Sequence, residues 1–392
     1  MPITSLSYAP PVRRSSVPPK LDYEAYEQAS ALADEGKHRE SLSKIFEHLF
    51  PGRPEYIVSP DAASFELAFV QGSSRVRVQL LDGELIVTVP LAKLPSAGNA
   101  IAAMRYVLTK ISGSGQLHQP RLHGDDIYLE FRDKVSRLHP NKIVEVFRRM
   151  PIEADTHDDW MIGQFAALPL ARVEAEPLDG SERARCEAIW SSHWNDVEEL
   201  LKESQRKRST FFLNEVTAYT IYRVWFALPL SGFLSSRMSE SARTFNDGDI
   251  DPVKREAVLA RCIKEMKAVT TAELHANLGH RQYAINPLVD GDPDVLDNYL
   301  GAGNYTEQIE KLRETGKTFD AALALISTYN FLLARYSWPE LVASELKAGL
   351  EAASGKPWRE AATVLWDHAQ QLVATFSSDE DDDDDGDQQE QP

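Results

Sequence analysis

The residues best suited to chemistry are an acid and two histidines in the stretch ELHANLGHR, namely Glu273, His275 and His280. Carboxylates and imidazoles are ordinary ligands of Zn²⁺. On a helix, two histidines share a face when they lie four residues apart, as in the H-E-x-x-H motif, whereas these two lie five apart. Gly279 precedes the second histidine and is typical of a helix end, so we predict no metal site here.

An acidic run in NDGDIDP has the spacing of a calcium-binding loop at Asp247, Asp249 and Asp251. Such a loop requires Gly at its sixth position and Glu at its twelfth. This chain has Pro252 and Val258 at those positions. An Asp directly before a Pro is instead typical of the start of a helix.

A second cluster, Asp155, His157, Asp158 and Asp159, has the residue types of acid–base catalysis. Because the four residues are almost consecutive, we expect their side chains to point in different directions. Asp is also common in the first turn of a helix, where it interacts favourably with the helix dipole. The cluster therefore predicts no catalytic pair.

Cys186 and Cys262 are the two cysteines of the chain, and each lies in a helical pattern. Two distant cysteines provide neither a disulfide framework nor the spacing of a zinc site, which suggests a reducing compartment. The glycine-containing stretch GAGN at 301–304 lacks the Lys-Ser/Thr that follows in a phosphate-binding loop. The sequence thus predicts no catalytic residue, no cofactor and no metal.

The charge of the chain is concentrated at its C-terminus. The net charge of 392 residues is −18, and the tail SDEDDDDDGDQQEQP contributes nine acids and no base. Like charges in such a run repel one another, so we expect a disordered tail over 377–392. The rest of the chain is also acidic, which argues against a nucleic-acid partner.

The N-terminus and the apolar stretches indicate where the protein resides. Residues 1–20 lack the apolar core of a secretory signal and are expected to form a disordered arm rich in Pro and Ser. The most apolar stretch, 211–234, contains Glu215, Arg223 and Pro229. It is therefore too interrupted to span a membrane, and we expect a cytoplasmic protein.

Three antiparallel strands are predicted in FELAFVQGSSRVRVQLLDGELIVTVPLAK, where apolar and polar residues alternate on either side of the Asp82-Gly83 turn. One face of this sheet is strongly apolar and should pack on helices. The opposite face is expected to be available for contact with a partner. Its predicted partner-binding residues are Ala68, Val70, Arg75, Arg77, Ile86 and Thr88.

Helical patterns surround these strands. A helical hairpin precedes them, and a helix, a second strand hairpin and a final helix that starts at Pro140 and is broken at Pro151 follow them. From residue 178 to residue 376 helical patterns alone remain. We therefore predict an α+β fold with a disordered arm (1–20), an α-βββ-α-ββ-α sheet domain (21–170), an all-helical domain (178–376) and the acidic tail.

The α-βββ-α-ββ-α order, the Asp82-Gly83 hairpin and the acidic balance resemble type III secretion chaperones of the CesT kind and the related YbjN-like proteins. This resemblance covers about a third of the chain. It implies a homodimeric, non-enzymatic protein that holds a peptide segment of a protein partner against its sheet and helices. The extra N-terminal helix and the helical domain depart from the small secretion chaperones.

The sequence and this resemblance together predict a peptide-binding chaperone or adaptor, with an exposed sheet edge that could accept an incoming strand. A solvated sheet face without a partner would have a similar composition. Two other functions remain open at this point. One is an enzyme with its site around Glu273, His275 and His280, and the other is a structural subunit of a larger assembly.

Overall fold

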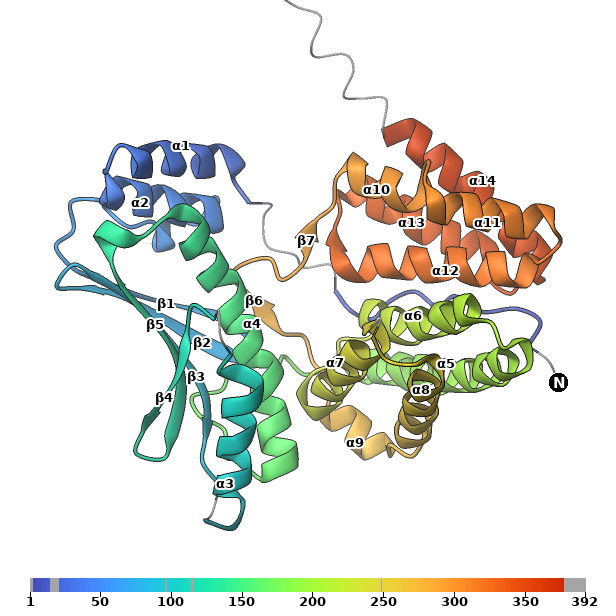
Figure 1. Ribbon diagram of the computed structural model, residues 1–392, viewed down its shortest axis with the longest axis horizontal. Helices are drawn as coiled ribbons and strands as arrows, with labels where there is room; N and C mark the ends of the chain where they lie inside the picture. Colours follow the sequence, from blue (N-terminus) through green and yellow to red (C-terminus); the bar gives the residue numbers. More distant parts are fainter. Residues whose placement is uncertain (1–2, 15–20, 96, 114–115, 248, 377–392) are drawn as a thin grey trace, which may run out of the picture.

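The chain folds into a sheet domain and a helical domain that lie side by side (Figure 1). The computed structural model describes residues 3–14, 21–95, 97–113, 116–247 and 249–376. The acidic tail and residues 1–2 and 15–20 of the predicted arm lie outside this range. No helix in the described ranges is long and apolar enough to cross a membrane.

The sheet domain has the predicted order of elements, and the mixed α+β class is confirmed. Short 3₁₀ or π turns occur at Pro54–Tyr56, Val107–Ile111 and Val135–Arg137. Its helices and strands are α1 (Tyr23–Asp34), α2 (His38–Leu49), β1 (Phe65–Gly72), β2 (Ser74–Leu81), β3 (Glu84–Lys93), α3 (Ala97–Tyr106), β4 (Gln119–His123), β5 (Asp126–Lys134) and α4 (Pro140–Phe165).

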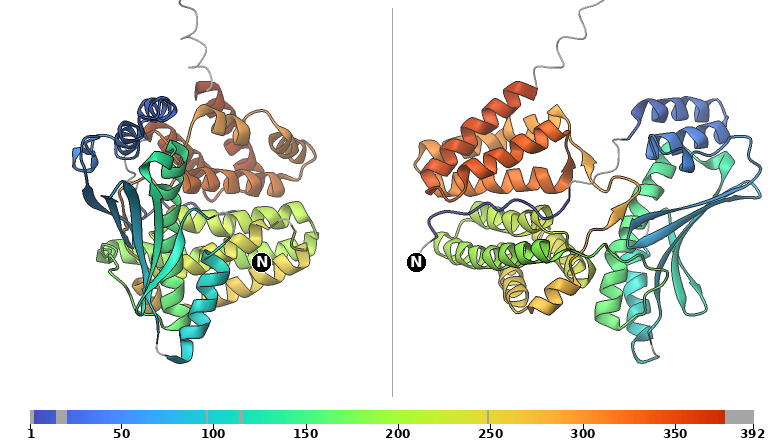
Figure 2. Two further views of the ribbon diagram at one scale, coloured as in Figure 1. Left: turned by 60° about the vertical axis from the view of Figure 1, so that its left-hand side comes forward. Right: turned by 180° about the vertical axis from the view of Figure 1, so that it is seen from behind.

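Helices α2 and α4 pack on one face of the antiparallel sheet, and the core between them is aromatic (Figures 1 and 2). Phe46 of α2 and Phe69 of β1 both contact Phe147 of α4, with ring centroids 5.5 and 6.0 Å apart. All three side chains are at most 2% exposed. The alternation of apolar residues along the strands therefore has the predicted result, a sheet with one buried face.

The sheet contains a strand that alternation does not predict. Its order is β4-β5-β3-β2-β1-β6, and β6 (Gln282–Tyr283) comes from the middle of the helical domain. Gln71 of β1 pairs with Tyr283, and its side-chain amide also bonds both backbone groups of Ile285. Because β6 is only two residues long, no alternation of apolar residues could reveal it.

The prediction that Pro151 breaks the last helix of the sheet domain is wrong. Helix α4 continues through Pro151 to Phe165. A proline removes one backbone hydrogen bond of a helix and adds a clash, so tertiary packing must offset this cost. Such packing is present, because the first half of α4 covers the sheet and the second half packs against α7 (Gly232–Asn246).

The helical domain is built around one continuous apolar core, in which the alanine-rich α12 packs on α6. The helical spacing of Trp358, Ala362, Leu365 and Leu372 predicts a buried stripe. Ala362, Leu365 and Leu372 are buried in this core, whereas Trp358 is half-buried. Two further short strands, β7 (Val289–Asp290) and β8 (Tyr336–Ser337), pair in parallel. Besides α7, its helices are α5 (Gly180–Lys207), α6 (Thr210–Ala227), α8 (Pro252–Lys267), α9 (Thr271–Ala276), α10 (Pro293–Leu300), α11 (Asn304–Glu314), α12 (Thr318–Arg335), α13 (Glu340–Ala353) and α14 (Trp358–Phe376).

A buried group of charged residues, which we call the carboxylate cluster, joins the two domains. Arg281, next to β6, forms ion pairs with both Asp155 and Asp159 of α4. Arg172, in the segment after α4, bonds the other oxygen of Asp159 at 2.5 Å. The Ser73 hydroxyl donates to Asp158 at 2.6 Å. The side chain of Arg281 is only 6% exposed.

The expectation that these aspartates diverge is therefore wrong for three of the four residues. Asp155, Asp158 and Asp159 are spaced i, i+3 and i+4, which places them on one face of a helix. His157 points elsewhere, and its Nδ1 lies 2.7 Å from the Tyr106 hydroxyl. Burial, followed by the two neighbouring carboxylates, raises the pKa of Asp158 well above its usual range. A protonated Asp158 leaves two carboxylates facing two guanidinium groups, which balances the buried charge.

A substitution at Gly72 tests the packing of β1 against the carboxylate cluster, because a Cβ atom at this position would lie 2.4 Å from the carboxyl carbon of Asp155. Gly72 and Gly83 both have a positive φ, so Ala at either position costs about 1 kcal/mol in backbone strain. Only Gly72→Ala must also push Asp155 away from its partners. We expect Gly72→Ala to lower the free energy of unfolding by about 3 kcal/mol or more, because it breaks a buried ion pair.

Chemical denaturation of both variants measures the difference. Gly83→Ala is the matched control, since nothing lies within 4 Å of its added Cβ atom. Equal destabilisation of the two variants would show that the contact between β1 and the carboxylate cluster contributes nothing to stability.

Candidate functional site: a groove that holds an extended segment

The N-terminal segment of the chain lies extended in a groove of the helical domain. Residues 3–14, which we call the arm, pass between the layer of α5 and α6 and the layer of α12 to α14 (Figures 1 and 2). Leu6 and Val12 of the arm are 6% and 5% exposed and belong to the core of the helical domain. The prediction of a disordered arm over 1–20 is therefore wrong for this part.

The first half of the arm is bound by the turn between α13 and α14. The backbone N–H of Gly355 donates to the carbonyl of Leu6 at 2.8 Å, and that of Tyr8 donates to the Ser354 hydroxyl at 2.9 Å. The indole of Trp358 donates to the carbonyl of Ile3 at 3.0 Å. These bonds recognise an extended backbone rather than particular side chains.

The second half of the arm supplies hydrogen-bond donors to the backbone carbonyls at the end of α6. The last carbonyls of a helix have no partner within it. Here the N–H groups of Val12 and Arg13 donate to the carbonyl of Ala227 at 2.8 and 3.2 Å, and the Arg13 guanidinium donates to that of Trp225 at 2.9 Å. The helix ends at this point because Pro229 follows two residues later.

Two prolines in the middle of the arm suit this binding mode. Pro10 and Pro11 have no N–H group to satisfy and favour an extended backbone. Their carbonyls both accept hydrogen bonds from Arg185 of α5 at 3.1 Å. Arg223 of α6 donates to the neighbouring carbonyl of Ala9, also at 3.1 Å. The groove therefore supplies donors on the side where the arm offers acceptors.

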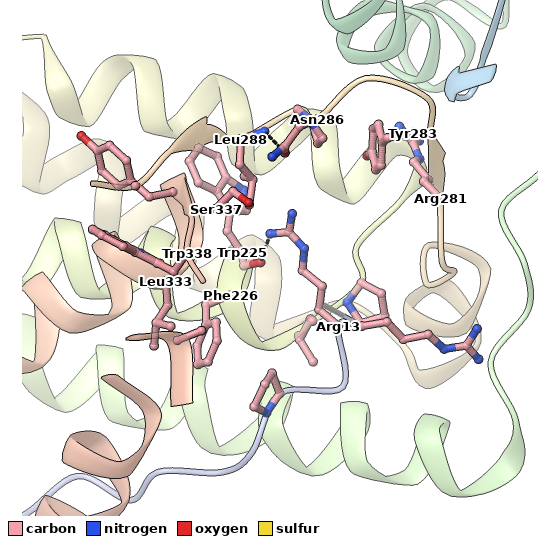
Figure 3. Close-up of a pocket in the computed structure, with 18 of the residues that line it drawn as sticks. Arg13, Trp225, Phe226, Arg281, Tyr283, Asn286, Leu288, Leu333, Ser337 and Trp338 are labelled. Carbon is pink, nitrogen blue, oxygen red and sulfur yellow. Dashed lines mark hydrogen bonds between the residues drawn. The ribbon is translucent and has the colours of Figure 1, made fainter. Parts of the chain in front are cut away.

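The arm leads into a cleft of about 750 Å³ at the end of α6. Its walls are the end of the arm, the end of α6, residues 279–291, which we call the connector, and the junction of α12 and α13. Aromatic rings of Trp225, Tyr283, Tyr336 and Trp338 line it. Figure 3 shows Arg13 extending from the arm toward the connector residues Leu288 and Asn286.

Cations outnumber acids in the lining of this cleft. Arg14 is paired with Glu176 and Glu182, and Arg281 belongs to the carboxylate cluster. Arg13 and Lys347 have no ion pair among the residues that the structure describes. Burial lowers the pKa of the Arg13 guanidinium, and the compensating interaction comes from the Tyr283 hydroxyl.

The six residues predicted to bind a partner lie together on the open face of the sheet. Ala68, Arg75 and Arg77 are exposed, whereas Val70 and Thr88 are half-buried and Ile86 is 7% exposed. Arg77 makes a two-pronged ion pair with Glu66 of the neighbouring strand, at 2.9 Å for both bonds. Their role in binding a partner stays a prediction.

The other candidate residues are dispersed. His275 and His280 interact with different acids of α5, Glu187 at 2.7 Å and Glu182 at 3.3 Å. Glu273 completes a capping box with Thr270 at the start of α9. Within the described ranges, no three His, Cys, Asp or Glu side chains are grouped so that they could hold a metal ion.

Asp251 caps α8 as expected, and the thiols of Cys186 and Cys262 are both buried. Burial raises the pKa of the Cys186 thiol to about 12. The backbone N–H of Asp249 donates to the carboxylate of Asp247 at 3.0 Å.

Neither a family model nor a curated protein matches this chain.

Helix α6, which forms one wall of the groove, carries a buried acid that makes its packing sensitive to pH. Glu215 is 6% exposed, and burial raises its pKa to about 8 although the Tyr305 hydroxyl bonds to it. The folded chain therefore retains a proton that the unfolded chain loses near pH 4.5. We expect the stability to fall as the pH rises from about 4.5 to about 8, by at most about 1.4 kcal/mol per pH unit.

Urea unfolding of Glu215→Gln across this pH range isolates the effect, because the amide stays neutral. In the variant, the free energy of unfolding should fall less steeply with pH than in the unmodified chain. The difference in free energy of unfolding between the variant and the unmodified chain should therefore increase with pH in favour of the variant. Glu307→Gln, on the exposed face of α11, is the matched control. An identical slope in Glu215→Gln and in the unmodified chain would contradict a proton on Glu215.

Proposed function

We propose that this protein is a cytoplasmic, non-enzymatic chaperone or adaptor that binds an extended segment of a protein partner in the groove of its helical domain. One observation carries the proposal, namely the arm seated in that groove. A segment of about twelve residues lies extended with its apolar side chains in the core and its backbone bonded to the groove walls. Such backbone bonding supports recognition of any chain that can adopt the same path.

The contacts of the arm define the segment that fits. Leucine and valine six positions apart fill the two buried sites, and two prolines lie between them. Arg185 and Arg223 bond the carbonyls in this middle part. A partner segment should therefore carry apolar residues at the Leu6 and Val12 positions and a proline-containing, extended middle.

The sheet domain supports the same kind of function. Its order of elements is the one that resembles the secretion chaperones, whose relatives hold peptide segments against sheet and helices. Strand β6 already uses the end of β1 by strand addition, at Gln71 and Gly72. The backbone N–H of Ala284 also donates to the carbonyl of Val70 at 2.9 Å. The remainder of this edge, from Phe65 to Phe69, offers the same backbone pattern to a partner strand.

A protease site introduced within residues 15–20 tests the groove without removing the arm. Cleavage turns the arm into a separate peptide that remains bound but can exchange. We expect the cleaved protein to take up a fluorescent peptide of residues 3–14, measured by anisotropy. The uncleaved protein should take up little, because its tethered arm competes at an effective concentration of about 1 mM.

Peptides displayed from a proteome and selected on the cleaved protein identify the partner class. Selected peptides should share the apolar–proline–apolar pattern and should displace the arm. The sheet-face variant Ala68→Glu should select the same peptides. Peptides that do not displace the arm, or that depend on Ala68, would move the binding function away from the groove.

Substitutions within the peptide test which side chains provide the affinity. Leu6→Ala removes a side chain that is buried in the core, and we expect it to weaken binding by about 2 to 3 kcal/mol, or 30-fold to 150-fold. Thr4→Ala, two residues away, changes an exposed side chain and should leave the affinity unchanged. Competition against the fluorescent arm peptide measures both, and equal affinities would contradict the assigned register.

A further inference from the structure

We infer that the cleft beside the groove is a binding site for a small carboxylate attached to a flat apolar body. This site is distinct from the groove, because its walls come from the connector, the end of α6, the junction of α12 and α13 and the end of the arm. Three features of the cleft carry the inference, namely a cation without a carboxylate partner, an amide donor without an acceptor, and a wall of aromatic rings.

The cation is Arg13. Its guanidinium donates to the carbonyl of Trp225, and no carboxylate in the described part of the chain pairs with it. Its five N–H donors form a planar fork that matches the two oxygens of a carboxylate. An arginine that is partly buried without a counter-ion is costly, so an anion that enters the cleft gains the full attraction of this charge.

The amide donor is Asn286 of the connector, which is 3% exposed. Its Oδ1 accepts a hydrogen bond from the backbone N–H of Leu288 at 2.9 Å, which fixes the orientation of the amide. Its Nδ2 has no hydrogen-bond partner among the described residues. A buried N–H group without an acceptor costs free energy that a ligand oxygen can recover.

The shape and charge of the walls limit the ligand. Trp225, Tyr336 and Trp338 provide flat apolar surfaces that suit a ring or another planar group. Asp290 and Glu340 also line the cleft and repel further negative charge, so a monoanion fits better than a phosphate dianion. Lys347 of α13 also lines the cleft and adds a second cation.

The anion site also has a consequence for the groove, and this consequence rests on the proposed function. Arg13 belongs to the arm, so the carboxylate binds with full affinity only while the arm is seated. Because linkage is reciprocal, the bound carboxylate stabilises the seated arm by the same factor. A carboxylate in the cleft should therefore slow the exchange of the arm for a partner segment.

The test uses the full chain and two probes that differ only in charge, phenylacetate and its neutral counterpart phenylacetamide. Isothermal titration calorimetry should show saturable binding of phenylacetate and at least about tenfold weaker binding of phenylacetamide. Inorganic phosphate should bind more weakly than phenylacetate. Equal binding of the two aromatic probes, or no binding of phenylacetate, would overturn the carboxylate site.

Three variants locate the site. Arg13→Gln keeps the backbone bonds of the arm and should weaken phenylacetate binding at least about tenfold. Asn286→Asp keeps the acceptor for Leu288 but replaces the donor with a negative charge, so it should weaken binding at least as much. Arg14→Gln is the matched control, since Arg14 lines the same cleft but is paired with two glutamates. Equal effects of Arg13→Gln and Arg14→Gln would overturn the role of Arg13.

Failure of this inference is distinguishable from failure of the proposed function. Uptake of the arm peptide by the cleaved protein is measured without any carboxylate, and phenylacetate binding is measured on the uncleaved chain without any peptide. If both succeed, added phenylacetate should slow peptide exchange in the cleaved protein, and an unchanged exchange rate would overturn the linkage.

Discussion

The position of the connector depends on the ion pairs of Arg281 with Asp155 and Asp159. A guanidinium that is 6% exposed is stable in the folded chain only when its charge is balanced at short range. Burial lowers the pKa of Arg281, but the two aspartates outweigh burial and hold it above its ordinary value. Because the aspartates lie on α4 and Arg281 lies beside β6, this balance holds the connector against the sheet domain. The connector in turn forms one wall of the cleft, so the geometry of the cleft follows from the carboxylate cluster.

The binding of the arm in the groove depends on another constraint. The backbone carbonyls at the end of α6 have no hydrogen-bond donor within the helix. Pro229 prevents the helix from continuing, and the carbonyls of Trp225 and Ala227 must find donors outside it. The arm provides these donors through two backbone N–H groups and the Arg13 guanidinium. Under the proposed function, a partner segment that replaces the arm would have to offer donors at the same places, and the end of α6 would be the selective part of the groove.

The sequence predicts those helices and strands in which a periodic pattern of apolar residues extends over many positions. Alternation over eight to ten residues identifies β1, β2 and β3, and the helical stripe from Ala362 to Leu372 identifies α14. The two-residue strands have no period to detect, and β6 lies against β1 through contacts with Gln71 and the carboxylate cluster, which are distant in sequence. Likewise, α4 passes through Pro151 because packing on both sides offsets the lost hydrogen bond.

The sequence predicts little of the candidate site, for a related reason. The spacing of Asp155, Asp158 and Asp159 was a usable signal of a shared helix face, but their partners Arg172 and Arg281 are distant in sequence. The arm offered a weaker signal in Leu6, Tyr8 and Val12, which alternate irregularly around two prolines. No local rule distinguishes such a segment from a disordered one, because its order comes from a groove formed by residues 185 to 358.

A tethered arm sets a threshold for any partner. If the arm alone bound the groove with a Kd of about 10 μM, an effective concentration of about 1 mM would keep it about 99% seated. A partner segment would then bind about 100-fold more weakly than to an empty groove, a difference of about 2.7 kcal/mol. Only segments that fill the Leu6 and Val12 sites better than the arm, or that gain a second contact on the sheet edge, would displace it. Under the proposed function, the arm would therefore make the groove selective among the extended segments that could enter it.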